Sequence, residues 1–138
     1  MSIDTTQLLH RLSEARDIKT FLEENEQEFH QVTTAELLGA YAEQNGLSVS
    51  AIADRSGHGE YVYKVFRGER KPSRDVLIAI AFGMALTIDQ TQLLLRITKM
   101  SGLDPRDPRD SILLYALKNK KSIMETNDLL YELKQQTL

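Results

Sequence analysis

The fold is decided by residues 46–73, which read GLSVSAIADRSGHGEYVYKVFRGERKPS. Within them, the pattern predicts a short helix over 49–55, a tight glycine turn at 56–59 and a second helix over 60–67. A basic turn over 68–72 follows, and after it an apolar helix begins. The segment is therefore predicted to form two short helices that meet at a glycine turn.

Helix start signals recur through the rest of the chain, whereas the alternation typical of strands does not persist. Each of three signals pairs a capping hydroxyl with an acid or amide three residues on: Thr33 with Glu36, Thr87 with Gln90, and Ser122 with Glu125. Asp107 before Pro108 marks a further start, because proline at the first helical position loses no hydrogen bond. Gly46 marks a helix stop. An all-α fold is predicted.

Length and composition limit the classes of function. The chain has 138 residues, a formal net charge of -3 and no cysteine, which excludes disulfides and thiolate metal sites. The longest apolar run, over 76–86, is shorter than the roughly 18 residues that a membrane span needs. It predicts instead a helix buried on nearly all sides. We expect a cytoplasmic protein that does not contact membranes.

The charges are unevenly distributed. Residues 1–36 carry three basic and eight acidic side chains, a net charge of -5, and their helices are expected over 6–15 and 18–25. The apolar residues there that we expect to make core contacts are Leu8, Leu9, Leu12, Phe21 and Leu22. From Arg55 to Arg74 there are six basic and two acidic residues, a net charge of +4. The mildly acidic total therefore conceals a local basic segment that could face nucleic acid.

Two short helices joined by a glycine turn, with basic residues after the second, form the helix-turn-helix arrangement. Over residues 37–86 the sequence resembles the Xre/Cro repressor-like helix-turn-helix family. The residues that carry this resemblance are Gly46-Leu47-Ser48, Ile52-Ala53, Ser56-Gly57, Val62, Val65, Arg67-Gly68, Pro72-Ser73, Leu77 and Ile80-Ala81. The whole chain is also similar to small bacterial Xre-like regulators, through the core 61–75, Arg109-Asp110 and 125–127.

The resemblance implies a lambda-repressor-like helix-turn-helix core over 34–86. It also implies an acidic helical arm over 1–33 and a helical C-terminal extension over 87–138. The leucine-rich faces of this extension could complete the monomer core or form a homodimer interface. We weigh both alternatives.

By the same resemblance, the helix over about 59–67 is the recognition helix, which lies in the major groove of double-stranded DNA. The expected base contacts are Gly59, Glu60, Tyr61 and Lys64. The expected phosphate contacts, within or beside the basic turn over 67–74, are Ser48, Arg67, Arg70, Lys71, Ser73 and Arg74. Compared with the common family pattern, the turn before this helix is one residue shorter, and Gly59 stands where a polar contact residue is usual.

No pattern typical of an enzyme, a metal site or a cofactor site is present. His10, His30 and His58 lack the spacing of helical metal ligands, and 57–59 is too short for a phosphate-binding loop. We therefore predict a DNA-binding transcriptional regulator without catalytic residues, cofactor or metal.

The acidic residues suggest two further possibilities, a different function and a regulatory role for the arm. Glu60 and the acidic arm favour an adaptor or antitoxin-like module that binds a protein partner through the same scaffold. The acidic arm could also fold over the basic turn as an autoinhibitor that imitates DNA.

Overall fold

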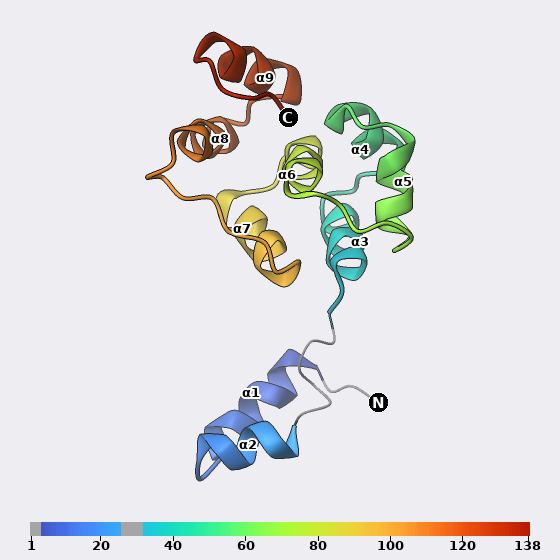
Figure 1. Ribbon diagram of the computed structural model, residues 1–138. Coiled ribbons are helices and arrows are strands. Elements are labelled where there is room, and N and C mark those ends of the chain that lie inside the picture. Colours follow the sequence, from blue (N-terminus) through green and yellow to red (C-terminus); the bar gives the residue numbers. More distant parts are fainter. Residues whose placement is uncertain (1–3, 26–31) are drawn as a thin grey trace. The chain divides into compact units, whose positions relative to one another are not determined.

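The computed structural model describes residues 4–25 and 32–138, and the secondary structure of these residues is helical throughout. The helices drawn in Figure 1 are α1 (Thr5–Glu14), α2 (Ile18–Glu24), α3 (Thr34–Gln44), α4 (Val49–Ser56), α5 (Glu60–Phe66), α6 (Arg74–Gly83), α7 (Ile88–Ile97), α8 (Pro108–Lys118) and α9 (Ile123–Glu132). The prediction of an all-α fold is confirmed. The chain divides into two units, residues 1–33 and residues 34–138.

The smaller unit contains α1 and α2, which contact each other. Phe21 is its buried apolar residue, and the Arg11 guanidinium donates to the Asn25 side chain at 2.8 Å. The other expected core residues behave differently: Leu8 is half-buried, and the side chains of Leu9, Leu12 and Leu22 are exposed. The expectation was wrong for these three because two short helices share only one line of contact.

Helices of the larger unit begin at the predicted caps. The Thr87 and Ser122 hydroxyls accept from the main-chain N–H groups of Gln90 and Glu125, and the longer side chains accept in return, so two of the three predicted capping boxes are confirmed. The capping box of Thr33 with Glu36 stays a prediction. The N–H of Ser122 holds the pKa of the Glu125 carboxyl below its usual value. The predicted start at Asp107 is also present, with Pro108 as the first helical residue of α8.

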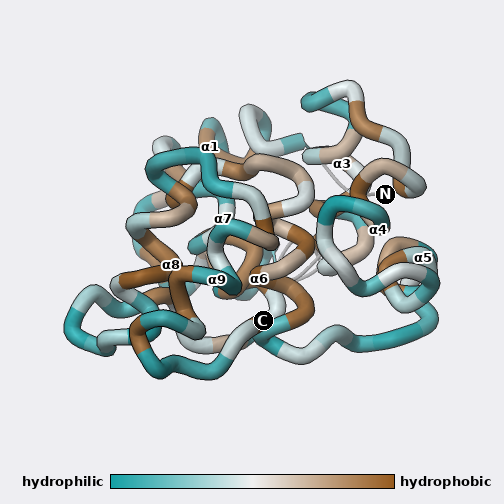
Figure 2. Tube along the Cα trace, turned by 90° about the horizontal axis from the view of Figure 1, so that it is seen from above, coloured by the Kyte–Doolittle hydropathy of each residue, from teal (hydrophilic) through white to brown (hydrophobic). Residues whose placement is uncertain are grey.

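Helix α6 forms the centre of the larger unit (Figure 1). Its residues from Leu77 to Gly83 are all buried, and it packs against α4, α7 and α9. Figure 2 shows the contrast between this hydrophobic helix and the hydrophilic turn that joins it to α5. The prediction of a helix buried on nearly all sides is confirmed.

The tail helices add to the same core. Their buried leucines belong to one cluster with α4, α5 and α6 and are Leu94, Leu95, Leu113, Leu117 and Leu130. Large apolar side chains of the tail that remain exposed are Tyr115, Met124, Tyr131 and Leu133. A homodimer that buries the second set stays a prediction. None of the helices in the described ranges combines the length and apolar character that crossing a bilayer requires.

Candidate nucleic-acid interface

The turn between α4 and α5 depends on two glycines with positive φ. Gly57 ends α4 in the left-handed region at φ 78°, and Gly59 precedes α5 at φ 54° and ψ -130°. Residues with a Cβ rarely adopt this conformation of Gly59, which explains why a polar contact residue is missing there. An interaction of Gly59 with a base can involve only its main chain.

Helix α5 has an inward and an outward face. Val62 and Val65 are buried, as the helical spacing predicts, whereas Phe66 is only half-buried. Glu60 is exposed and Lys64 is half-buried on the outward side. Within the described residues neither of these two side chains has a hydrogen-bond or ion-pair partner, so both are available to a ligand.

The basic turn is attached to α5 through Tyr61. The Tyr61 hydroxyl donates to the Lys71 carbonyl oxygen at 3.3 Å, and the ring is half-buried against the core. This bond joins the main chain of the turn at Lys71 to α5. Arg70 and Lys71 are exposed, and in the part of the chain that the structure describes their charges have no ionic partner.

Arg67 already has an anionic partner. Its guanidinium donates twice to the Glu69 carboxylate, at 3.0 and 3.1 Å. More than half of each side chain is exposed, so the pair contributes little to stability. A phosphate could displace Glu69 at small cost.

Ser48 and Ser73 cap α4 and α6, the helices that precede and follow α5 in the chain. The Ser48 hydroxyl accepts from the Ala51 N–H at 3.1 Å, and the Ser73 hydroxyl accepts from the Val76 N–H at 3.2 Å. Helix starts favour anions because their first N–H groups are free and point outward.

A comparison with protein families finds one that covers these elements. A family model described as helix-turn-helix matches residues 38–82, which run from α3 through most of α6. Residues 38–82 are an Xre/Cro-like helix-turn-helix domain. Among curated proteins and solved structures, no match is found. The family is one of DNA-binding regulators, and the arm and the tail lie outside the matched helix-turn-helix domain.

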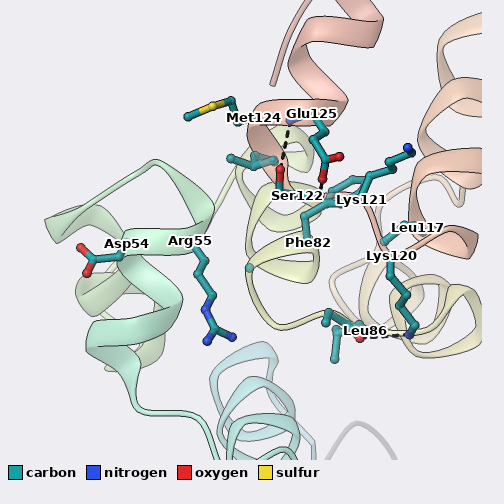
Figure 3. Close-up of a pocket in the computed structure, with 13 residues that line it drawn as sticks. Asp54, Arg55, Phe82, Leu86, Leu117, Lys120, Lys121, Ser122, Met124 and Glu125 are labelled. Atoms are coloured by element: carbon teal, nitrogen blue, oxygen red, sulfur yellow. Dashed lines mark hydrogen bonds between the residues drawn. The ribbon is translucent and has the colours of Figure 1, made fainter.

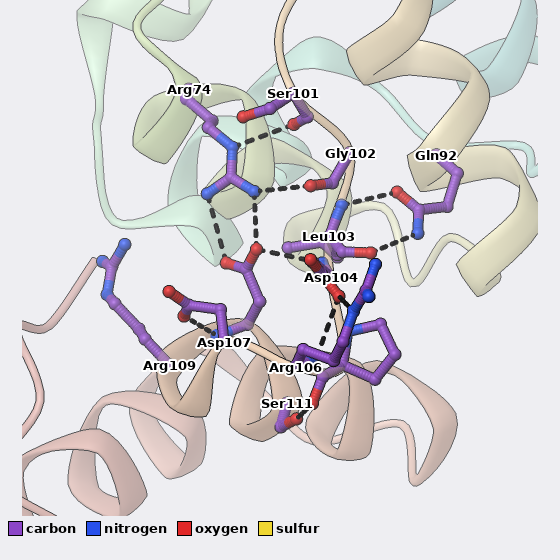
Figure 4. A network of polar contacts seen from close by, with 12 residues as sticks. Arg74, Gln92, Ser101, Gly102, Leu103, Asp104, Arg106, Asp107, Arg109 and Ser111 are labelled. Atoms are coloured by element: carbon purple, nitrogen blue, oxygen red, sulfur yellow. Dashed lines mark hydrogen bonds and ion pairs between the residues drawn. The ribbon is translucent and has the colours of Figure 1, made fainter.

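The sequence predicts that Arg74 contacts a phosphate, but its side chain faces the tail. Its guanidinium donates to both Asp110 carboxylate oxygens, at 2.9 and 3.2 Å, and to the Ser101 and Gly102 carbonyl oxygens, both at 3.0 Å (Figure 4). A guanidinium bound in this way has no free edge for a phosphate. We therefore leave Arg74 out of the proposed DNA contacts.

Asp75 and Arg109 form a second ion pair, in which α6 supplies the acid and α8 supplies the base. Arg109 donates to both carboxylate oxygens of Asp75, at 2.9 and 3.0 Å, and also to the Gln136 carbonyl oxygen at 2.8 Å. Adjacent residues 74–75 of α6 thus pair with adjacent residues 109–110 of α8. The resemblance to small bacterial Xre-like regulators includes Arg109-Asp110 but implies no role for it. Both segments carry the dipeptide Arg-Asp, and this repetition was the only sign in the sequence that they could form two crossed ion pairs.

The histidines give no sign of a metal centre. Within the described ranges no group of three His, Cys, Asp or Glu side chains stands close enough to hold a metal ion. His10 lies 3.2 Å from Glu14, one turn along α1, and His30 falls outside the described residues.

Proposed function

We propose that this protein is a transcriptional regulator that reads double-stranded DNA with α5 in the major groove and places residues 67–73 on phosphates. The observation that carries the proposal is the bond from the Tyr61 hydroxyl to the Lys71 carbonyl oxygen, because it joins α5 to the turn that carries Arg70 and Lys71. A helix that reads bases needs such flanking phosphate contacts to set its register.

Two side chains of α5 would read base edges. Lys64 can donate to guanine O6 or N7, and Glu60 can accept from cytosine N4. Tyr61 has a different role in the proposal, because its hydroxyl already donates to Lys71. It positions the turn, and the accessible part of its half-buried ring could contact a thymine methyl group.

Phosphates would be held on both sides of α5. Arg70 and Lys71 contribute free charges, and Arg67 contributes after exchanging Glu69 for a phosphate. The starts of α4 and α6, capped by Ser48 and Ser73, add main-chain donors. Each neutralised phosphate releases counterions, so binding should weaken steeply as salt rises.

Selection from a random pool of duplexes, followed by fluorescence anisotropy, tests the proposal. We expect Lys64→Ala to lose discrimination at one base pair, with a cost of about 1–3 kcal/mol on the preferred site. Lys71→Ala should instead weaken all duplexes alike and lower the salt slope by about one unit. Lys118→Ala, an exposed lysine of α8, is the matched control and should bind as the wild type does.

Failure of the wild type to bind any duplex at low salt would refute DNA reading. If a stoichiometric protein partner were then recovered, the adaptor alternative would replace it. The exposed Glu60, which repels phosphates, is the feature that favours this second function.

The pair between Arg67 and Glu69 leads to an independent prediction. Glu69→Gln should strengthen DNA binding severalfold at low salt, because it frees Arg67 and removes a negative charge near the phosphates. The salt slope should change little, because Arg67 contacts a phosphate in the bound wild type as well. Glu132→Gln, an exposed acid in α9, is the control for the change in net charge. Unchanged or weaker binding by Glu69→Gln would contradict the proposed place of Arg67.

A further inference from the structure

A pocket of about 470 Å³ lies between α4, the ends of α6 and α8, and the start of α9 (Figure 3). This volume falls within the range of about 300–1,000 Å³ that is usual for small-molecule sites. Two walls are the turned ends of α6 and α8, where Ala85 and Lys120 adopt φ of 52° and 54°. The pocket is distinct from the proposed DNA surface on α5.

Most of the lining is hydrocarbon. The apolar side chains come from three separate parts of the fold and are Phe82, Ala85, Leu86, Leu117, Ile123 and Met124. In the described part of the chain, no buried side-chain nitrogen or oxygen lacks a hydrogen-bond partner. A ligand therefore does not need a polar group to satisfy a buried atom of the protein. Such a lining favours an aliphatic or aromatic body.

The charges at the rim are unequal. Arg55 extends toward the space between α4 and the other walls, and within the described residues its guanidinium has no partner (Figure 3). The Lys120 ammonium lies 3.4 Å from the Ala85 carbonyl oxygen, which leaves two of its three donors free. Both are exposed cations beside an apolar lining.

The two acids of the rim are placed differently. Asp54 points away from the pocket in Figure 3. The Glu125 carboxylate accepts a hydrogen bond from the Ser122 N–H at 3.0 Å as part of the α9 capping box. This carboxylate therefore faces the start of α9. The field at the pocket opening therefore favours an anion.

We propose that this pocket binds a small apolar carboxylate. The hydrocarbon part lies against Phe82, Leu117 and Ile123, and the carboxylate faces Arg55. A guanidinium can donate two parallel hydrogen bonds to a carboxylate, and so gives the site its preference for that head group. This binding does not depend on the proposed reading of DNA.

Isothermal titration of the full chain with octanoate, octan-1-ol and octylammonium tests the site. We expect saturable 1:1 binding of octanoate, weaker binding of octanol and the weakest binding of octylammonium. Arg55→Gln should weaken octanoate binding about tenfold and leave octanol binding unchanged, because a charge-assisted hydrogen bond is lost. Arg70→Gln removes an equally exposed cation outside the pocket and should leave both affinities unchanged.

The location is tested by methyl chemical-shift changes. Octanoate should shift the methyl signals of Leu117, Ile123 and Met124 and leave those of Leu9 and Leu12 in α1 unchanged. The proposal is overturned if no ligand gives a saturable heat, if octylammonium binds as well as octanoate, or if the shifts concentrate in α1. Equal losses from Arg55→Gln and Arg70→Gln would also overturn it.

Discussion

Replacing Asp110 by alanine should lower the free energy of unfolding by about 3 kcal/mol, the lower part of the range for a broken buried ion pair. The Asp110 side chain is only 9% exposed and accepts from Arg74 and from the Asp104 N–H at 3.0 Å. Its removal leaves a guanidinium, 26% exposed, without its charge partner. The Ser101 and Gly102 carbonyl oxygens still hold Arg74, which is why the upper part of the range is not expected.

Urea denaturation followed by circular dichroism measures this loss. Arg106→Ala is the matched control, because Arg106 is 92% exposed and lies 3.5 Å from Asp104, a contact of small energetic value. The double variant Arg74→Leu with Asp110→Leu should regain part of the stability, since it leaves no unpaired charge. A loss below about 1 kcal/mol for Asp110→Ala would show that water screens the pair.

The two ion pairs connect the start of α6 to the tail. Ser73 and the basic turn directly precede Arg74, so the pair with Asp110 fixes the end of the turn that we propose to lie on phosphates. The pair between Asp75 and Arg109 is more exposed on the acidic side, at 35%, and adds the segment around Gln136. Weakening of DNA binding by Asp110→Ala would therefore be an indirect effect of a displaced turn.

Much of the fold could be predicted from the sequence because its signals are local. A cap such as Thr87 with Gln90 involves only residues of one helical turn. Gly46, with φ at 63°, ends α3 through the conformation of its own backbone. The burial of Val62 and Val65 follows from the period of one helix.

The partners of charged residues could not be predicted in the same way. Sequence shows that Arg74 is basic and near the turn, but its guanidinium turns toward Asp110, which lies 36 residues further on. Charge counting treats every cation of the segment as free, and it assigned Arg74 to phosphate for that reason. The pocket was also invisible in the sequence, because its lining comes from α4, α6, α8 and α9.

Replacing Gly83 by leucine should lower the free energy of unfolding by about 3 kcal/mol, a value typical of severe overpacking. A Cβ at Gly83 would lie 3.1 Å from both the Ile52 carbonyl oxygen and the Ser56 nitrogen, and 3.4 Å from the Ser56 Cα. These are main-chain atoms of α4, so the whole helix would have to move. Leucine is a good helix former, and the loss would therefore report the contact between α4 and α6.

Gly39→Ala in α3 is the opposite case, because a Cβ there meets no atom within 4 Å. This variant should gain up to about 1 kcal/mol, since alanine has the higher helix propensity. Thermal unfolding of both variants separates the two effects, and equal stability of Gly83→Leu and the wild type would contradict the close approach. Because α4 leads through Gly57 into α5, which we propose to carry the base contacts, the displaced helix in Gly83→Leu should also weaken binding to the preferred duplex more than to other duplexes.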